Sequence, residues 1–227
     1  DDDVGMVWPP VVNVPLLKRM SGPAGEVIED ELLAEAARQL DAEDAWIGQA
    51  LLEPNQSREH AAMQRNGFAR MTELQFFERP LTDGSSRPKR VEYSSLTYEP
   101  YRRSRNRLAF ANVLEATYRG SLDCPELNGM RDGQQSLKNH EAAGSFNPDM
   151  WRLYRREGVD VGILLMAERP DQQAWEVLYL GVVESARGSG IGRAMLFDAL
   201  DAAREANVKR LLIVADVRNV PAVSLYE

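Results

Sequence analysis

The sequence predicts an α/β fold, and three observations carry the prediction. An apolar run at 177–183 ends in a glycine-rich loop, and an amphipathic helix follows directly. A second apolar run at 211–217 is nearly continuous, as is typical of a strand covered on both faces. The order helix, strand, Asn, helix occurs twice, at 27–65 and at 190–227. We therefore expect strands and helices to alternate in two related units.

The first unit is expected at residues 1–80. Its elements, in order, are a strand at 4–14, a helix at 27–40, a strand at 46–52, a helix at 56–65 and a strand at 68–78. Pro9 and Pro10 cannot donate ladder hydrogen bonds, so the first strand should end or bulge there. Gly67 is expected to end the second helix in the left-handed conformation.

The second unit is expected at 91–227, after a linker at 81–90 that is rich in Pro, Gly and Ser. Its elements, in order, are a strand at 91–98, a helix at 103–117, a short helix near 135–142, a hairpin of strands at 150–155 and 159–167, the strand at 177–183, a helix from 190 to about 206, a strand at 211–217 and a helix from Asn219. Pro221 is tolerated in the first turn of that last helix.

Composition narrows the classes of function. A length of 227 residues suits two domains, and a net charge of −8 does not indicate a nucleic-acid-binding surface. No apolar run reaches the roughly 20 residues of a membrane helix, and the acidic start does not resemble a signal peptide. The single cysteine, Cys124, fits a cytoplasmic protein, and it has no metal-ligand spacing with His140.

The glycine loop at 187–192, which reads R-x-x-G-x-G, is the most informative stretch. Glycines let a backbone approach closely, and the free N–H groups of a first helical turn attract anions. The loop matches neither the dinucleotide motif nor the P-loop. It resembles the acetyl-CoA pyrophosphate signature of the Gcn5-related N-acetyltransferases, the GNAT superfamily. The resemblance implies the GNAT acyl-CoA N-acyltransferase fold, with an α+β mixed sheet.

The layout of the chain resembles the same superfamily. The first unit resembles the C-terminal half of a GNAT domain, which closes with a helix, a Gly-Phe (here Gly67-Phe68) and a strand. The second resembles a GNAT domain that lacks its last strands. We therefore expect a tandem GNAT protein, incomplete at both ends, with a degenerate first copy, a layout similar to that of the mycothiol synthases. The first unit lacks R-x-x-G-x-G and has Ala62 where the second has Tyr226, so the second unit should hold the active site.

The resemblance implies acetyl-CoA as co-substrate. Backbone N–H groups of the loop would hold the pyrophosphate, and the open edge of the preceding strand would bind the pantetheine arm, with an N–H near Val182 serving the thioester carbonyl. Arg187 and Arg193 would add positive charge, or else lie in solvent as ordinary cations. Asn219 would bind the cofactor arm through its amide. The implied cofactor-binding residues are Leu180, Val182, Val183, Arg187, Gly188, Ser189, Gly190, Ile191, Gly192, Arg193 and Asn219.

Two residues are the candidates for catalysis. The segment N-V-P-A-V-S-L-Y-E at 219–227 closely matches the family's N-x-x-A-x-x-L-Y-E, which implies that Tyr226 protonates the departing thiolate; packing in the core is the alternative role. A tyrosine has an ordinary pKa of about 10. Glu176 would be the general base, directly or through water, or only a surface carboxylate. Tyr179 is the neighbouring candidate, on the opposite face by the alternation of a strand.

The acceptor site is expected at 121–129, where GNAT proteins vary. Its acidic residues would suit a cationic amine, either a small molecule or a protein N-terminus. The sequence thus predicts an enzyme, an N-acetyltransferase that moves an acetyl group from acetyl-CoA to an amine by direct transfer in a ternary complex. It predicts no metal and no nucleic-acid or membrane partner, and it leaves a homodimer open. The alternatives are a non-catalytic module that binds or senses acyl-CoA and a structural dimerisation domain.

Overall fold

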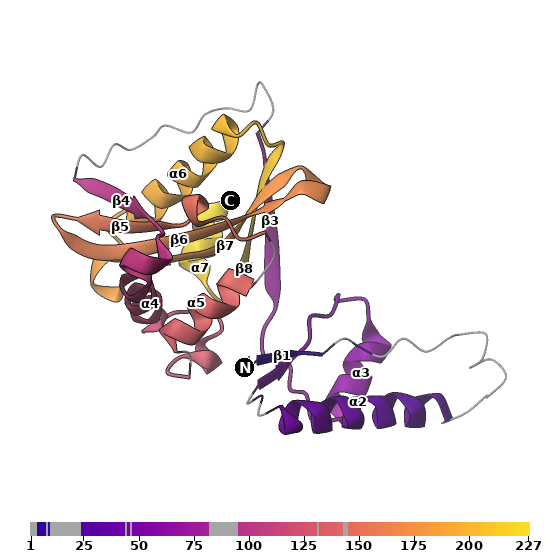
Figure 1. Cartoon of the computed structure of the whole chain (residues 1–227). Coiled ribbons are helices and arrows are strands. Elements are labelled where there is room, and N and C mark those ends of the chain that lie inside the picture. The colour runs from indigo at the N-terminus through magenta and orange to yellow at the C-terminus, as the bar shows by residue number, and fades with distance from the viewer. Residues whose placement is uncertain are drawn as a thin grey trace. The chain divides into compact units, whose positions relative to one another are not determined.

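The computed structural model describes residues 4–7, 9, 24–43, 45, 47–81, 95–130, 132–142 and 145–227. They belong to two compact units, one ending at Met71 and the other beginning at Thr72 (Figure 1). Each unit has a hydrophobic core of its own. The predicted linker beyond residue 81, and the first strand beyond residue 9, lie outside the described residues.

The first unit combines two short strands with two helices. Strands β1 (Val4–Met6) and β2 (Ile47–Gln49) pair in parallel, and helix α2 (Ala24–Ala42) contacts helix α3 (Ser57–Arg65). The buried side chains of its core are Val7, Leu33, Ala62 and Met63. Gly67 follows α3 with a φ of +85°, which confirms the left-handed stop predicted there. That this unit derives from a GNAT-like half stays a prediction.

The second unit is built, within the described residues, on a six-stranded mixed sheet with the order β3-β8-β7-β6-β5-β4. The strands are β3 (Leu74–Pro80), β4 (Leu96–Pro100), β5 (Arg152–Arg156), β6 (Val159–Arg169), β7 (Ala174–Val182) and β8 (Arg210–Asp216). Neighbouring strands are antiparallel, except that β7 and β8 are parallel. The predicted α/β class with a mixed sheet is confirmed, and so is the hairpin of β5 and β6.

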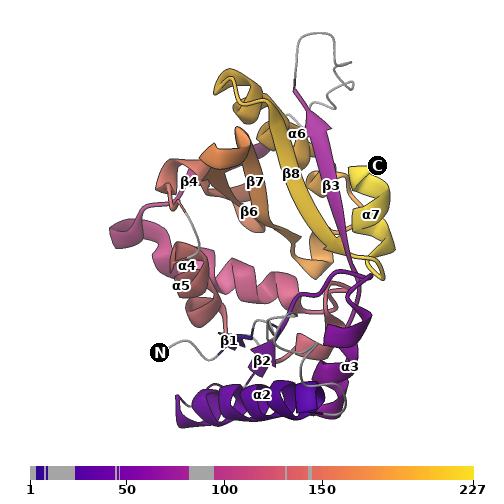
Figure 2. The ribbon, with the colours of Figure 1, turned by 90° about the vertical axis from the view of Figure 1, so that its right-hand side faces the viewer.

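Helices cover both faces of this sheet. Helix α4 (Arg103–Tyr118) lies against β6 and β7, with α5 (Gly133–Ala142) packed on it. Helices α6 (Ile191–Glu205) and α7 (Val220–Tyr226) lie on the other face (Figure 2). The core lies between these layers, and its largest fully buried side chains include Trp151, Tyr101, Tyr154 and Phe110.

Strand β8 is buried on one face only, which differs from the prediction for 211–217. Leu211, Ile213 and Ala215 are buried, whereas Leu212 and Val214 are half-buried. The reason is that α6 and α7 cover one face of β8, whereas the face that points away from these two helices is only partly covered.

Strand β3 corrects the predicted domain boundary. The sequence pattern assigned a strand at 68–78 to the first unit, ending at residue 80. In the structure, β3 pairs antiparallel with β8, from Leu74 opposite Asp216 to Pro80 opposite Arg210. The first unit accordingly ends at Met71, and β3 pairs with the edge of β8 and is the outer strand of the second unit's sheet.

Candidate active site

The sheet opens between β7 and β8 near its centre. The two strands pair only over 174–177 and 210–213. Beyond this point β7 keeps its partner β6, whereas β8 continues beside β3. Among the described residues, the edge of β7 that faces β8 therefore has no strand partner over 178–182.

The backbone of Leu180 and Val182 points into this opening. Val183 donates its N–H to the carbonyl of Val161 on the β6 side, at 3.0 Å. Alternate residues of an antiparallel strand direct their polar groups to opposite sides. The N–H groups of Leu180 and Val182 therefore face the departed β8, as the predicted pantetheine contact requires, whereas the N–H of Val183 is used within the sheet.

A β-bulge accompanies the opening. Leu165 of β6 lies opposite Tyr179, but the next residue, Met166, lies opposite Val177, which leaves Leu178 as the extra residue. A bulge bends its strand and increases the local twist. The bend occurs at the position where β7 leaves β8.

The bulge also changes which side chains share a face. Tyr179 lies opposite Leu165, and Glu176 lies opposite Ala167. Leu165 and Ala167 are two residues apart on the regular strand β6, so they point to the same face. Tyr179 and Glu176 therefore share the face that α4 covers, and the prediction that they lie on opposite faces is wrong.

The glycine loop follows the opened strand. Gly188 and Gly190 have φ angles of +71° and +82°, in the left-handed region that favours glycine. Ser189 donates its hydroxyl to the carbonyl of Ala186 at 2.6 Å, which closes the loop. Ile191 then begins α6, whose N-terminus is not capped by the residue before it. The first N–H groups of α6 are therefore available to an anion, and the helix dipole favours negative charge there.

The first turn of α6 packs against both the opened strand and α7. A Cβ at Gly192 would lie 3.6 Å from Leu225 of α7 and 3.7 Å from Val182. It would lie 3.9 Å from Leu180. The glycine loop, the opened edge of β7 and helix α7 thus meet in one place.

Helix α7 begins at a side-chain cap. The side-chain oxygen of Asn219 accepts the N–H of Ala222 at 3.3 Å, and Pro221 occupies the first turn. Tyr226 is the last residue of the helix, and its ring packs edge-on against Phe77 of β3 with 5.6 Å between centroids. Asn219 therefore uses its side-chain oxygen to start the helix that carries Tyr226.

Residues 114–227 match the family model described as the acetyltransferase (GNAT) family. The matched segment contains the opened strand, the glycine loop and α7. The chain belongs to the GNAT acetyltransferase family. This confirms the resemblance drawn from the loop and from residues 219–227; the tandem layout stays a prediction.

Curated relatives of the chain carry the name mycothiol acetyltransferase. The protein of Thermobispora bispora is 30% identical over 167 residues, which are 71% of this chain and 54% of that protein. The protein of Thermomonospora curvata is 29% identical over 161 residues, which are 71% of this chain and 52% of that protein. The chain spans about half the length of these relatives.

Two solved structures confirm the GNAT fold. A GCN5-related N-acetyltransferase from Sphaerobacter thermophilus superposes with a TM-score of 0.55 at 16% identity, covering 75% of this chain and 50% of that one. A GCN5-related glucosamine N-acetyltransferase region of a fungal multi-domain GH3 β-N-acetylglucosaminidase superposes with a TM-score of 0.54 at 15% identity. This match covers 81% of this chain and 24% of that one. At these identities the likeness concerns the fold alone.

The arginine of the GNAT loop is held by backbone carbonyls. Arg187 donates from Nε to the carbonyl of Val182 at 3.1 Å. Its terminal nitrogens donate to the carbonyls of Thr117, Arg119 and Gly120, at 2.7–2.9 Å. These carbonyls lie at the C-terminal end of α4, where helical partners run out and the dipole is negative. The geometry gives Arg187 a capping role; that it also adds charge beside the pyrophosphate stays a prediction.

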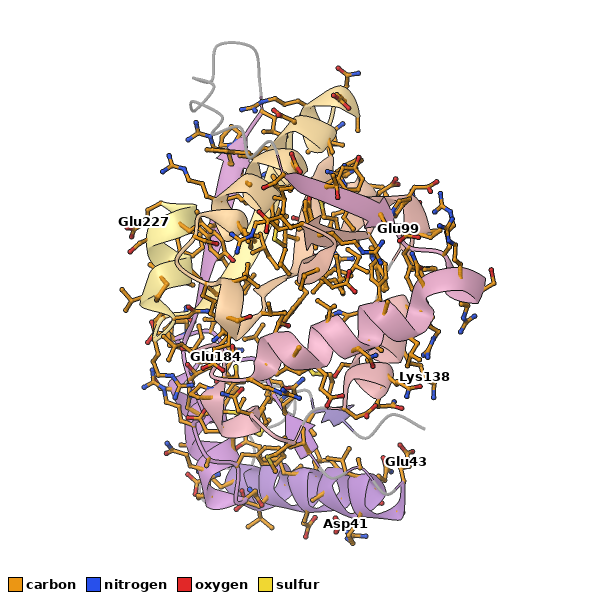
Figure 3. The ribbon with its side chains drawn as sticks, turned by 90° about the vertical axis from the view of Figure 1, so that its left-hand side faces the viewer. Asp41, Glu43, Glu99, Lys138, Glu184 and Glu227 are labelled. Atoms are coloured by element: carbon orange, nitrogen blue, oxygen red, sulfur yellow. The ribbon has the colours of Figure 1, made fainter. Side chains whose placement is uncertain are left out.

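Arg193 is the second exposed arginine of the loop region. It lies in the first turn of α6, with its guanidinium 5.4 Å from the ring centroid of Phe197. Glu184, labelled in Figure 3, begins the short 3-10 turn that precedes the loop. That Arg193 adds charge beside the pyrophosphate stays a prediction.

Glu176 forms an ion pair with Arg169, with 2.5 Å between Oε2 and Nε and with side chains that are 24% and 30% exposed. It lies in the part of β7 that still pairs with β8. Tyr179 lies beyond the bulge, where its hydroxyl is 2.7 Å from the hydroxyl of Thr117 and its ring is 6.0 Å from that of His140. The structure therefore places the two base candidates on either side of the point where the sheet opens.

The predicted acceptor loop is tied to the end of β8. Asp123 accepts the N–H of Asp216 at 2.9 Å, and Asp216 accepts the N–H of Cys124 at 3.0 Å. Asp216 is fully buried and also accepts from the backbone and the guanidinium of Arg218, at 2.8 and 2.7 Å. These contacts fix the loop beside the C-terminal end of β8, where α7 begins.

Arg218 neutralises two carboxylates at this end of the strand. Burial alone would raise the pKa of Asp216, but hydrogen bonds from Arg218, Thr72 and Cys124 outweigh it and hold that pKa well below its usual range. Arg218 also contacts both oxygens of Glu126, at 2.5 and 2.9 Å, and lowers the pKa of that carboxyl. Glu126 is therefore already paired, which weakens its predicted role in attracting a cationic amine.

The environment of Tyr226 keeps its phenol protonated. Burial raises the pKa of Tyr226, and the negative charge of Asp123 raises it further, because both disfavour the phenolate. A residue that donates a proton near neutral pH must carry that proton beforehand. The same raised pKa makes the phenol a weaker donor, and the role of Tyr226 as the acid stays a prediction.

Sequence reasoning missed Phe77, Thr117, Asp216 and Arg218. Asp216 had a signal, since a polar residue at the carboxyl end of a buried strand often lies at a site in α/β proteins. Phe77 and Thr117 had none, because their contacts with Tyr226 and Tyr179 join segments far apart in the chain, and the same holds for the contact of Arg218 with Glu126.

In the part of the chain that the structure describes, no helix is long and apolar enough to cross a membrane. The same residues contain no group of three or more His, Cys, Asp or Glu side chains arranged to hold a metal ion.

Proposed function

We propose that the second unit transfers an acetyl group from acetyl-CoA to an amine, directly, in a ternary complex. The observation that carries this proposal is the meeting of three features at one point: the opened edge of β7, the uncapped start of α6 and helix α7, whose last residue is Tyr226. Membership in an acetyltransferase family and relatives named for acetyl transfer support it. A cytoplasmic location belongs to the proposal, because a single cysteine fits a reducing compartment.

The cofactor would bind along the opening. The N–H groups from Gly188 to Gly192 would hold the pyrophosphate, and the pantetheine amides would pair with the free edge at Leu180 and Val182. An N–H near Val182 would then donate to the thioester oxygen, where negative charge develops as the amine attacks. The opening supplies this N–H without breaking the sheet, because β8 has already departed.

Two side chains would move the protons. Glu176 would accept a proton from the amine, directly or through a water molecule, so that the neutral amine attacks the thioester carbon. The C–S bond then breaks, and Tyr226 would protonate the departing thiolate. The ion pair with Arg169 fixes the position of the Glu176 carboxylate at the edge of the opening.

The acceptor would approach from the face that α4 covers, beside the loop at 121–129. This loop is fixed to the end of β8 next to α7, so it borders the reaction centre. The name of the relatives points to an acceptor of the mycothiol type.

Acetyl transfer is measured as CoA release with a panel of amines that includes mycothiol without its acetyl group. Tyr226→Phe should lower kcat about 100-fold and leave CoA affinity near that of the unmodified chain, since a positioned acid contributes about 10²–10⁴-fold. Tyr98→Phe, at a half-exposed tyrosine 49% accessible, is the matched control and should keep full turnover. Unchanged turnover in Tyr226→Phe would remove this residue from the mechanism.

One observation favours the alternative, a non-catalytic module that binds acyl-CoA: the base candidate Glu176 is engaged by Arg169. Calorimetry with CoA separates the two functions. Tight CoA binding with no acetylation of any amine in the panel supports the module, and turnover of any one amine excludes it.

A further inference from the structure

We propose that Phe77 is a positioning residue for Tyr226, supplied by a strand that precedes residues 82–94. The inference rests on the proposed function, in which Tyr226 donates a proton. It adds a residue outside the 114–227 segment that matches the GNAT family. A segment from before the predicted linker would thus complete the candidate active site of the second unit.

Strand β3 is fixed in register along its whole length. It makes seven residue pairs with β8, from Leu74 opposite Asp216 to Pro80 opposite Arg210. Backbone hydrogen bonds continue the ladder at both ends, between Val217 and Glu73 at 3.0 Å and between Leu81 and Lys209 at 2.8 Å. Because a slip of one residue would turn every side chain to the other face, this ladder decides where Phe77 points.

Two adjacent phenylalanines on β3 face opposite sides of the sheet. Phe77 lies opposite the buried Ile213 and packs against the main core. Phe76 lies opposite Val214 and is 66% exposed. The same strand thus offers a phenylalanine that contacts the candidate site and a matched one that does not.

Phe77 restricts the ring of Tyr226. The rings meet at an interplanar angle of 74°, the edge-to-face arrangement that aromatic pairs favour. Tyr226 is the last residue of a seven-residue helix, so few helical contacts hold its position. The ring of Phe77 supplies a wall on the β3 side. Because the hydroxyl is attached to the ring of Tyr226, the orientation of the Tyr226 ring sets the direction of this hydroxyl.

The kinetic test uses the full chain and measures kcat and KM for acetyl-CoA. Phe77→Ala should lower kcat about 10-fold to 100-fold, because a misplacement of about 1 Å costs up to that factor, and KM for acetyl-CoA should change less than about threefold. Phe76→Ala should keep both constants. Wild-type kcat in Phe77→Ala would overturn the proposal.

A double-mutant cycle separates positioning from a general structural effect. In the Tyr226→Phe background, Phe77→Ala should lower kcat by less than about twofold, because the hydroxyl that it positions is already absent. An equal loss in both backgrounds would overturn the proposal. If Phe77→Ala fails to fold, Phe77→Leu keeps most of the volume without the aromatic edge and carries the same expectations.

A second readout needs no turnover. With ring-¹³C-labelled tyrosine, the resonance of Tyr226 is identified by its loss in Tyr226→Phe. It should shift in Phe77→Ala and stay in place in Phe76→Ala; no shift in Phe77→Ala would overturn the proposal. If the shift occurs but the wild-type chain acetylates no amine, the contact stands and the proposed function fails.

Discussion

Replacing Arg187 by alanine distinguishes a capping arginine from one that binds the pyrophosphate. The substitution removes donors to four carbonyls, one at the end of β7 and three at the end of α4. The side chain is exposed, so each hydrogen bond is assigned the low end of the usual net range, about 0.5 kcal/mol. Four such bonds give about 2 kcal/mol, and the lost charge at the helix end adds about 0.3–1 kcal/mol.

The expected result is therefore a loss of about 2–3 kcal/mol. For a domain of this size each kcal/mol shifts Tm by about 2–4 °C, so Tm should fall by roughly 4–12 °C. Arg187→Lys keeps the charge but loses the planar fork, and it should give an intermediate loss. Thermal unfolding followed by circular dichroism measures the stability, and calorimetry with CoA measures the affinity.

Arg193→Ala is the matched control, because Arg193 is an exposed arginine of the same loop region whose contact is the ring of Phe197. It should change stability by about 0.5 kcal/mol or less. The capping argument is refuted if Arg187→Ala unfolds like the unmodified chain while its Kd for CoA rises tenfold or more. These two results together would indicate that Arg187 contacts the pyrophosphate, as the sequence predicts.

Three further predictions concern the loop, the buried network and the base. Gly190→Ala places a Cβ at a φ of +82°, so it should cost about 1–2 kcal/mol and weaken CoA binding about tenfold by calorimetry; unchanged affinity would remove the loop from the binding site. Asp216→Asn should cost about 2–3 kcal/mol in urea unfolding, because a buried acceptor of charged and backbone donors is weakened. The pKa of Asp216 is lower in the folded chain than in the unfolded chain, where it is about 3.9. The Asp216 carboxylate therefore stabilises the fold above about pH 3.9, and this stabilisation is lost as the pH falls below that value. The stability of Asp216→Asn should accordingly fall less steeply in acid than that of the unmodified chain. Glu176→Gln should lower kcat about 100-fold. It should change the free energy of unfolding by less than about 1 kcal/mol, because the ion pair with Arg169 is partly exposed. A kcat equal to that of the unmodified chain would exclude Glu176 as the base.

The parts of the fold that follow from local sequence patterns could be predicted. Apolar periodicity located the helices that became α2, α4 and α6, and a glycine with a left-handed φ ended α3 where expected. The loop at 187–192 and the N-cap at Asn219 also depend on short-range chemistry, so their positions were found.

Pairing between distant strands could not be predicted in the same way. The alternation at 68–78 indicates a strand but does not say which edge it joins, and β3 joined β8, more than a hundred residues away. The bulge at Leu178 could not be predicted either, because no particular residue type marks it in the sequence. It is visible only in the pairing of β7 with β6. That single extra residue placed Tyr179 on the face of Glu176, against simple alternation.

The same division separates what the sequence reveals about the cofactor from what it reveals about the acceptor. The cofactor side consists of the opened strand, the glycine loop and α7, which all lie within residues 174–227, so one stretch of the chain could indicate CoA. The acceptor side, which stays a prediction, depends on the loop at 121–129, where the contact of Asp123 with Asp216 arises only in the folded sheet. Long-range contacts of this kind vary without leaving a local pattern. The acceptor of a GNAT chain is therefore read from the pairing of its strands and loops, and the co-substrate from its motif.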